Sequence, residues 1–269
     1  MADRRAVGTP GRPLRIVVIG NSAVFLTVPP LEGRDDDPYA RWLPEALLDR
    51  GVHATVVQHA QWHATVLEVL PRFEAWVRDE LPDLVVVNLG IVDCQARVLP
   101  TWLLRNSMTW LPGQGGFARI YRRRVVPSLR PRIRGWQRFW AGRVGPRASR
   151  VRPAVFERAM TRLVQLSVSH ANAHVLLLDI DDANERLLHW MPGLQERIDR
   201  YNAILQRVAG GAAGGRATLA RTSRVVATDP ERLLPDGIHR SSEGHRVVAE
   251  ALADQVVRLG PVLGLQAGS

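Results

Sequence analysis

The chain lacks several features that would point to particular classes of protein. It has a single cysteine in 269 residues, which excludes a disulfide framework and a zinc site built on cysteines. No apolar run approaches the ~18–20 residues that a membrane-spanning helix needs. The first 13 residues are polar and contain three arginines, so no signal-peptide core precedes the first apolar segment. We therefore expect a cytoplasmic protein.

Lysine is absent too, and the arginines are unevenly distributed. The chain carries 36 basic residues, all arginine, against 26 acidic residues. Twelve of the arginines lie in one segment, Arg119–Arg152, which contains no Asp or Glu. The remaining 24 arginines nearly balance the acidic residues, so the net charge of +10 is a local property of this Arg-rich segment. Dense charge of one sign can attract anions.

The Arg-rich segment belongs to a longer stretch, 95–152, that has no strand pattern and is too long for an ordinary connection. We interpret it as a helical insertion. A helix there gathers four apolar side chains between arginines: Ile133, Trp136, Trp140 and Val144. This layout suits a membrane-surface anchor, a docking face for an acidic partner, or a lid over a substrate pocket. A solvated loop is the alternative, and nucleic acid is ranked last because no recognition fold is visible.

Outside this stretch, strand and helix patterns alternate. Apolar, β-branched runs predict five strands, at 14–20, 52–57, 84–90, 174–180 and 224–227. Helical patterns follow them, at 37–51 (or from 43), 71–81, 154–171, 192–209 and 241–259. This alternation predicts an α/β fold with a parallel sheet covered by helices on both faces. We expect one domain at 14–260, with flexible termini at 1–13 and 261–269.

Two short segments carry residue types suited to nucleophilic catalysis. Ser22 comes just after the first predicted strand, where ligands of parallel sheets bind. Far along the chain, Asp236 precedes His239 by three residues, with a glycine between them that lets the carboxylate orient the imidazole. Serine attack needs such a base with a fixed tautomer. The alternatives are a helix N-cap serine, a surface aspartate and a histidine at a helix start.

At these residues the sequence resembles the SGNH (GDSL-like) hydrolase family. Asp236-Gly-Ile-His239, followed by Glu243-Gly-His245, is similar to the family's final Asp-x-x-His block. Gly20-Asn21-Ser22 resembles its nucleophile block, with Asn21 where Asp is usual, and Gly90-Ile-Val-Asp93 resembles its third block, Gly-x-Asn-Asp. The segment 197–206 resembles the helix before its fifth strand. The resemblance spans about 14–259, apart from the insertion.

The resemblance implies a flavodoxin-like three-layer sandwich with a five-stranded parallel sheet, and neither a metal nor an organic cofactor. It implies that Ser22 is the nucleophile, His239 the general base and then acid, and Asp236 the orienting carboxylate. The family's oxyanion hole uses the backbone N–H of the serine, a backbone N–H of the second block and the third-block Asn side chain. By the same resemblance, Asn21, Gly90 and Asp93 belong to the substrate-binding blocks.

The chain departs from this pattern at two of the oxyanion-hole positions. Val92 stands where the third-block Asn is expected, and the second block, 58–63, lacks its usual glycine. We place His63 at that second-block position. Loss of one oxyanion donor can cost about 10²–10³ in rate. Either another donor substitutes (Asn88, His59, His63 or a residue of the insertion) or the enzyme is slow or specialised.

Two further signals have simpler interpretations. His59 and His63 are four residues apart and could share a helix face that binds a metal with Asp93. Because the sequence fixes no further ligand, we interpret them as a polar rim of the site and expect no metal. Cys94, at the end of the third strand, is interpreted as a small buried thiol rather than a nucleophile.

These observations predict a serine-dependent acyl ester hydrolase that forms an acyl-enzyme and acts on a small-molecule or carrier-bound ester. One alternative is an acyltransferase with an acyl-carrier or coenzyme A donor, since the tryptophans of the insertion could exclude water. The other is a non-catalytic scaffold that binds an acidic protein or an anionic membrane through the Arg-rich segment.

Overall fold

The computed structural model describes residues 12–21, 38–61, 63–96, 135, 139, 143, 149–234 and 239–265, and the structural statements below concern these residues. They form a five-stranded, all-parallel sheet in the order β2-β1-β3-β4-β5. The strands are β1 (Leu14–Gly20), β2 (Ala54–Ala60), β3 (Leu84–Asn88), β4 (His174–Leu178) and β5 (Ala217–Ala220). This is the flavodoxin-like strand order, and it confirms the predicted α/β fold.

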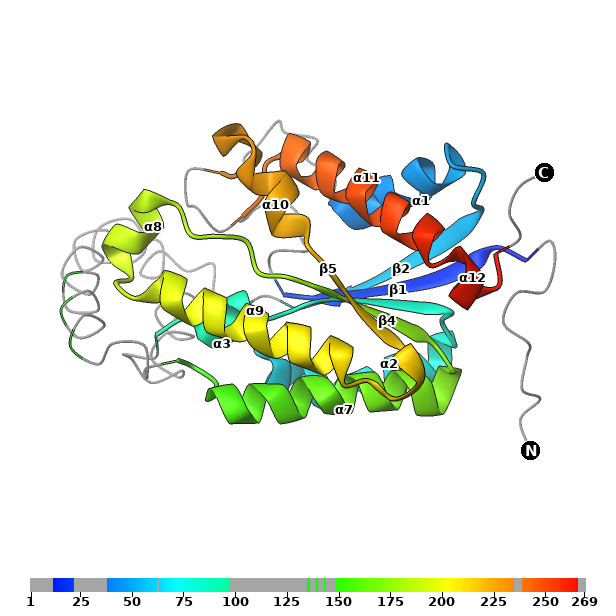
Figure 1. Cartoon of the computed structure of the whole chain (residues 1–269), viewed down its shortest axis with the longest axis horizontal. Helices are drawn as coiled ribbons and strands as arrows, with labels where there is room; N and C mark the ends of the chain where they lie inside the picture. The colour runs from blue at the N-terminus through cyan, green and yellow to red at the C-terminus, as the bar shows by residue number, and fades with distance from the viewer. Residues whose placement is uncertain are drawn as a thin grey trace, which may run out of the picture.

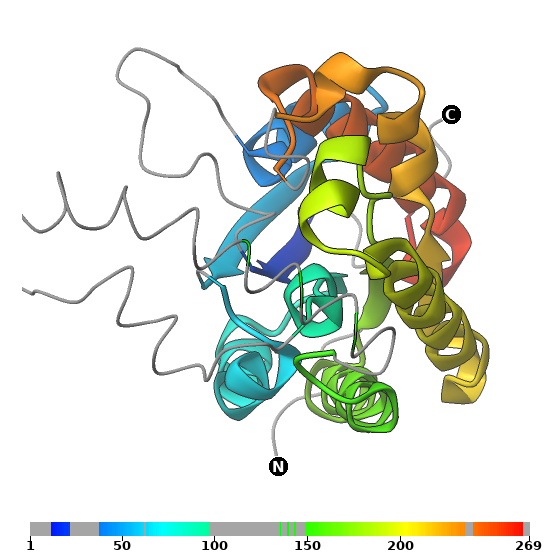
Figure 2. The same ribbon diagram turned by 90° about the vertical axis from the view of Figure 1, so that its left-hand side faces the viewer.

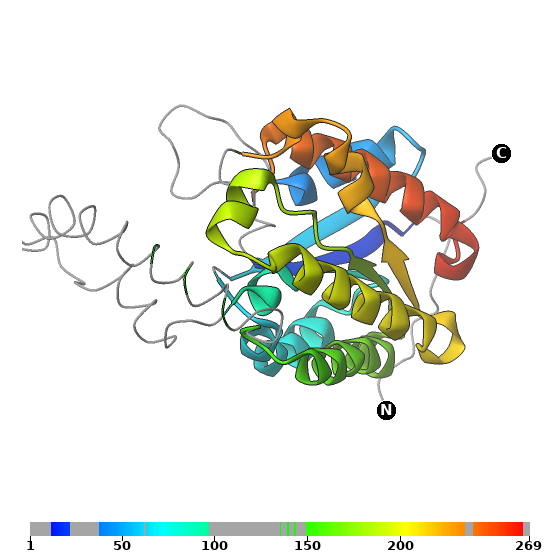
Figure 3. The ribbon, with the colours of Figure 1, turned by 60° about the vertical axis from the view of Figure 1, so that its left-hand side comes forward.

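Helices cover both faces of the sheet, giving three layers (Figure 1). One face carries α1 (Tyr39–Leu48), α10 (Thr222–Ala227), α11 (Ser242–Arg258) and α12 (Gly260–Leu263). The other carries α2 (Val66–Glu80), α3 (Ile91–Cys94), α7 (Pro153–Ala171) and α9 (Leu194–Gly210). Three short elements complete the described chain: α8 (Glu185–Trp190) and the 3₁₀ turns η3 (Ala213–Gly215) and η4 (Pro230–Arg232). Figure 3 shows the same layers obliquely.

The central strands are buried on both sides, which explains their unbroken apolar sequences. In β1, Val17 and Ile19 point into the core beneath α2 and α7, whereas Ile16 and Val18 point into the core beneath α1 and α11. All five residues of β3 are buried. A parallel sheet covered on both faces requires such two-sided hydrophobic strands.

The fifth strand lies earlier in the chain than the sequence predicts. The predicted strand at 224–227 is wrong, because these residues belong to α10, and β5 is Ala217–Ala220. The helix start is stabilised from β4's end: Asp179 accepts hydrogen bonds from the backbone N–H and the hydroxyl of Ser223, at 2.9 and 2.6 Å. A carboxylate at a helix N-terminus satisfies N–H groups that have no partner within the helix. Val226 of α10 then packs in the core.

Some helix boundaries also differ from the prediction. Helix α2 begins at Val66 rather than Pro71, because Thr65 and Glu68 form a capping box with a Thr65 N–H to Glu68 Oε2 distance of 2.9 Å. Leu81, the last residue of the predicted helix, instead follows α2 as its C-cap in the left-handed conformation and is 44% exposed. Helix α1 begins before Pro44, and α8 was not predicted.

The ends of the domain and the insertion are described only in part. Arg12 forms an ion pair with Asp83 at 2.5 Å, and the chain continues past α11 as α12. Of the insertion's middle part, Gly135, Phe139 and Arg143 are helical, and the Arg143 guanidinium lies 3.8 Å from the centre of the Phe139 ring. The predicted apolar side of the insertion lies outside the described residues. Among the described helices, none is both long and apolar enough to cross a membrane.

Candidate active site

The predicted site residues follow the carboxyl ends of neighbouring strands. Gly20, the last residue of β1, pairs with Ala60 of β2 on one side and Asn88 of β3 on the other. The three strands therefore end side by side, at the edge that faces the viewer in Figure 2. This is the edge at which open parallel sheets bind their ligands.

The nucleophile block begins at this edge. The carbonyl oxygen of Gly20 accepts a hydrogen bond of 3.1 Å from the backbone N–H of Gln61, which joins the end of β1 to the chain leaving β2. Asn21 is fully buried beside it. Ser22 follows directly in the sequence but lies outside the described residues, so its role as nucleophile stays a prediction.

The second block places His63 in an unusual backbone conformation. His63 has φ = 50°, in the left-handed region that favours glycine, which suits a position where the family usually has glycine. Although His63 is exposed, partial burial of its imidazole lowers the pKa of that ring, and the charges of Arg150 and His239 lower the pKa further. His63 and His239 are therefore close enough for the charge of one to act on the other.

The structure excludes the possibility that His59 and His63 share a helix face. His59 belongs to β2, where its ring stacks on Trp76 of α2 with 4.6 Å between ring centres. Its Nε2 lies 3.8 Å from the Glu80 carboxylate. His59 thus faces α2. Within the described ranges, no three His, Cys, Asp or Glu side chains are grouped so as to hold a metal ion.

The third block combines an obligatory glycine with an apolar residue. Gly90 has φ = 130°, so a side chain there would strain the backbone, and its Cβ, 2.6 Å from Cδ1 of Ile180, would also displace that side chain. Val92 is 2% exposed and packs in the hydrophobic core. The position that carries Asn in the family therefore supplies no polar group here.

Asp93 and Cys94 of the third block are fully buried. Asp93 Oδ1 accepts a hydrogen bond of 2.9 Å from the backbone N–H of Val66, so its carboxyl joins the third block to the start of α2, just after His63. Burial raises the pKa of Asp93 to about 7. Burial also raises the pKa of the Cys94 thiol, which agrees with its interpretation as an unreactive buried cysteine.

Helix α9 holds the third block through residues that sequence reasoning missed. Arg197 is fully buried, and its Nε donates to the carbonyl oxygen of Cys94 at 2.8 Å. The Tyr201 hydroxyl donates to the carbonyl oxygen of Val151. The backbone N–H of Val151 in turn donates to the carbonyl oxygen of Asp93 at 3.1 Å. The resemblance marked 197–206 as a helix, but an arginine inside the core carries no sequence signal, because charged residues are expected at the surface.

The final block is tied to the residues that precede it. The N–H of Leu234 donates to the carbonyl oxygen of His239 at 2.7 Å, and the N–H of Ser241 donates to that of Arg232 at 2.9 Å. His239 is 7% exposed. Asp236 belongs to the four residues between Leu234 and His239, which lie outside the described residues.

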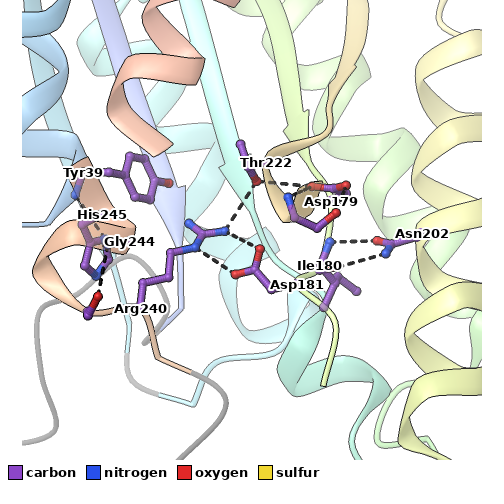
Figure 4. A network of polar contacts seen from close by, with 11 residues as sticks. Tyr39, Asp179, Ile180, Asp181, Asn202, Thr222, Arg240, Gly244 and His245 are labelled. Carbon is purple, nitrogen blue, oxygen red and sulfur yellow. Dashed lines mark hydrogen bonds and ion pairs between the residues drawn. The ribbon is translucent and has the colours of Figure 1, made fainter. Parts of the chain in front are cut away.

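Arg240, the residue after His239, is buried and forms an ion pair that was not predicted. Arg240 donates two hydrogen bonds to the Asp181 carboxylate, from Nε at 2.8 Å and from Nη2 at 3.0 Å (Figure 4). Burial alone would lower the pKa of Arg240, but Asp181 more than offsets this and raises it. The pair joins the final block to the segment after β4.

His245 joins two helices, α11 and α1. Its Nδ1 accepts a hydrogen bond of 3.3 Å from the backbone N–H of Tyr39, the first residue of α1. The residue before Tyr39 is Pro38, whose side chain cannot cap the helix, so the imidazole of α11 takes this role. Burial, with Arg240 and His239 adding to it, lowers the pKa of His245 to about 3, so the ring is neutral.

Comparison with known proteins agrees with this geometry. The model of the GDSL-like lipase/acylhydrolase family matches residues 18–247, a range that contains all the blocks described above. The chain belongs to this family. Membership makes it an ester-hydrolysing enzyme and confirms the SGNH resemblance. A search among curated proteins found no match.

Solved structures share the fold of this GDSL-like hydrolase. A lipase/acylhydrolase from Enterococcus faecalis has a TM-score of 0.59 and 16% identity, over 90% of this chain and 95% of that one. The acetylxylan esterase Axe2 from Geobacillus stearothermophilus has a TM-score of 0.57 and 17% identity, over 93% and 95%. A carbohydrate esterase of family 3 from Talaromyces cellulolyticus has a TM-score of 0.57 and 11% identity, over 91% of this chain and 97% of that one. At these identities the likeness establishes the fold.

Proposed function

We propose that the chain hydrolyses acyl esters with Ser22 as nucleophile, His239 as general base and Asp236 as the carboxylate that orients the imidazole. The observation that carries the proposal is the placing of His239. It is buried at the carboxyl edge, where its neighbour Arg240 is bonded to Asp181 just after β4, and it contributes to the lowered pKa of His63. The chain leading to His63 is bonded through Gln61 to Gly20, two residues before Ser22. These contacts support a single site, at this edge, for the final block and the nucleophile block.

The reaction follows from these roles. The Ser22 hydroxyl oxygen attacks the ester carbonyl carbon while His239 takes the hydroxyl proton. The tetrahedral intermediate collapses, the bond to the alcohol oxygen breaks, and His239 gives its proton to the leaving alcohol. A water molecule then attacks the acyl-enzyme with His239 again as base, which releases the acid and restores Ser22.

We propose further that His63 supplies the oxyanion donor that Val92 cannot. Two other candidates are less suitable: the His59 ring is stacked on Trp76, and Asn88 is buried on the side of β3 that faces α1. His63 stands where the family's second-block donor is expected. Its lowered pKa keeps the imidazole neutral at pH 7, so it has one N–H to donate.

The first experiment measures hydrolysis of p-nitrophenyl acetate and butyrate by the wild type and by Ser22→Ala and His239→Ala. We expect each variant to lose at least about 10³-fold in kcat, since removal of a nucleophile or base has effects of this size or larger. The matched control is Ser169→Ala, on α7, whose hydroxyl donates to the carbonyl oxygen of Leu166 at 3.3 Å. Activity of Ser22→Ala equal to that of the wild type would refute the proposal.

The second experiment separates the ring of His63 from its backbone. His63→Gly removes the imidazole and relaxes the left-handed backbone without removing the N–H. We expect kcat to fall about 10²-fold, as for loss of one oxyanion donor. His170→Ala, which removes an imidazole from α7 that pairs with Glu74, is the control. Unchanged kcat in His63→Gly would leave the backbone N–H as the only donor from this block.

A further inference from the structure

Backbone hydrogen bonds tie His239 and its neighbour Ser241 to a short element. The carbonyl oxygen of His239 accepts from Leu234, and the neighbouring Ser241 donates to Arg232. Arg232 ends the 3₁₀ turn η4, and neither residue belongs to the sheet. A direct connection from the final block to the strands would fix the imidazole relative to β1 more closely than these bonds alone.

Arg240 provides that connection. Its guanidinium and the Asp181 carboxylate meet through two parallel hydrogen bonds, and the two side chains are 2% and 14% exposed. A two-point contact of this kind fixes both the distance and the orientation of the arginine, whereas a lysine would make a contact at a single point. A single peptide unit links the α-carbon of Arg240 to that of His239.

Asp181 is itself firmly held at the end of β4. The preceding residue, Ile180, donates its N–H to the side chain of Asn202 on α9 at 2.8 Å and accepts from it at 3.0 Å. On the other side, Nη2 of Arg240 lies 3.5 Å from the hydroxyl of Thr222, which donates to Asp179. Figure 4 shows the whole path, from α9 through the end of β4 to Arg240.

We propose that Arg240 and Asp181 are positioning residues for His239: their buried, two-point ion pair fixes the backbone that carries the catalytic imidazole against the sheet. The inference rests on the proposed function, in which His239 is the base. A displacement of about 1 Å in a catalytic group costs about 10²-fold in rate. The pair thus acts on the rate of the chemical steps and not on substrate binding.

The test compares Arg240→Lys and Asp181→Asn with the wild type. Active sites are titrated with a fluorophosphonate, and kcat and KM are measured per titrated site, together with the thermal unfolding midpoint. We expect kcat to fall about 10²-fold with KM within about threefold. A pair that only stabilised the fold would lower the unfolding midpoint and the number of active sites and leave kcat per site unchanged.

Arg207→Lys is the matched control. Arg207 also makes a two-point contact, with Glu157 at 3.0 and 3.2 Å, but this pair joins α9 to α7 on the surface. We expect kcat of the wild type in this variant. A loss equal to that of Arg240→Lys would show that any such pair affects the rate, and would overturn the proposal.

A double variant separates positioning from the cost of a buried, unpaired charge. Arg240→Met with Asp181→Leu removes both charges, and such replacements of buried ion pairs are often neutral or stabilising. We expect a folded enzyme whose kcat stays low. Restored kcat in the double variant, or wild-type kcat in both single variants, refutes the inference while serine-dependent activity stands. Wild-type activity that survives Ser22→Ala refutes the proposed function itself, and this inference with it.

Discussion

Asp93 makes the stability of the fold depend on pH near neutrality. Burial raises the pKa of its carboxyl from 3.8 to about 7. The folded protein therefore binds this proton more tightly than the unfolded chain, so the contribution to stability is complete below pH 4 and is lost as the pH rises to 7. A shift of about 3 units corresponds to about 4 kcal/mol, of which about 3 kcal/mol is lost between pH 5 and pH 8.

The variant that isolates this contribution is Asp93→Asn. In the wild type, the Val66 nitrogen lies 2.9 Å from Asp93 Oδ1. The amide of the variant keeps a carbonyl oxygen that can accept this hydrogen bond, but it cannot ionise. The free energy of unfolding is measured by urea denaturation at pH 5 and at pH 8. We expect its decrease from pH 5 to pH 8 to be about 3 kcal/mol smaller in the variant than in the wild type. Asp79→Asn, at an exposed position of α2, is the control.

The result that would refute this reasoning is the same pH dependence of the free energy of unfolding in the wild type and in Asp93→Asn. If the wild type and Asp93→Asn lost the same free energy between pH 5 and pH 8, Asp93 would ionise in the folded protein as readily as in the unfolded chain. The carboxyl would then have a source of stabilisation for its charge beyond Val66 and Arg150, the leading groups that now lower its pKa.

Two further predictions concern the α11 region. His245→Asn keeps an acceptor for the Tyr39 N–H. Because the pKa of His245 is lowered from 6.5 to about 3, the contribution of this histidine to stability is present above pH 6.5 and is lost as the pH falls. We expect the variant to lose about 3 kcal/mol less than the wild type between pH 6.5 and pH 4 in urea denaturation, and equal losses would contradict this. Gly244→Ala would place a Cβ 2.0 Å from the carbonyl oxygen of Arg232, and we expect a loss of about 2–3 kcal/mol in stability. Gly210→Ala, where a Cβ meets nothing within 4 Å, is its control, and similar unfolding midpoints in the two variants would exclude the clash.

The parts of the fold that could be predicted are those whose local sequence decides the structure. The bounds of β1 are as predicted, because a β-branched run ends at a glycine, and α7 begins only one residue earlier than expected. The fifth strand could not be predicted. β5 has the sequence Ala-Thr-Leu-Ala, with little strand propensity, whereas Val225-Val226 looks like a strand. Asp179 stabilises the helical conformation of the latter segment, and it lies 44 residues before Ser223.

The candidate site divides in the same way. The blocks at Gly20, His63, Gly90 and His239 follow from motifs and their order after strands, and the structure brings their described residues to one edge. The contacts that hold these blocks do not follow from motifs. Arg240 and Asp181 are 59 residues apart, and neither position has a local pattern that calls for a partner. Only the fold makes them neighbours.

The two departures from the family pattern are physically connected. Val92 extends the hydrophobic core to the carboxyl edge, which removes a polar side chain from the third block. The neighbouring Asp93 is fully buried and accepts a hydrogen bond from the backbone N–H of Val66, three residues after His63. The third block thus no longer presents a donor, and instead fixes the start of α2 behind the second block. A rigid support of this kind is what a histidine with a left-handed backbone requires, because the strained conformation at His63 persists only if the surrounding structure holds it.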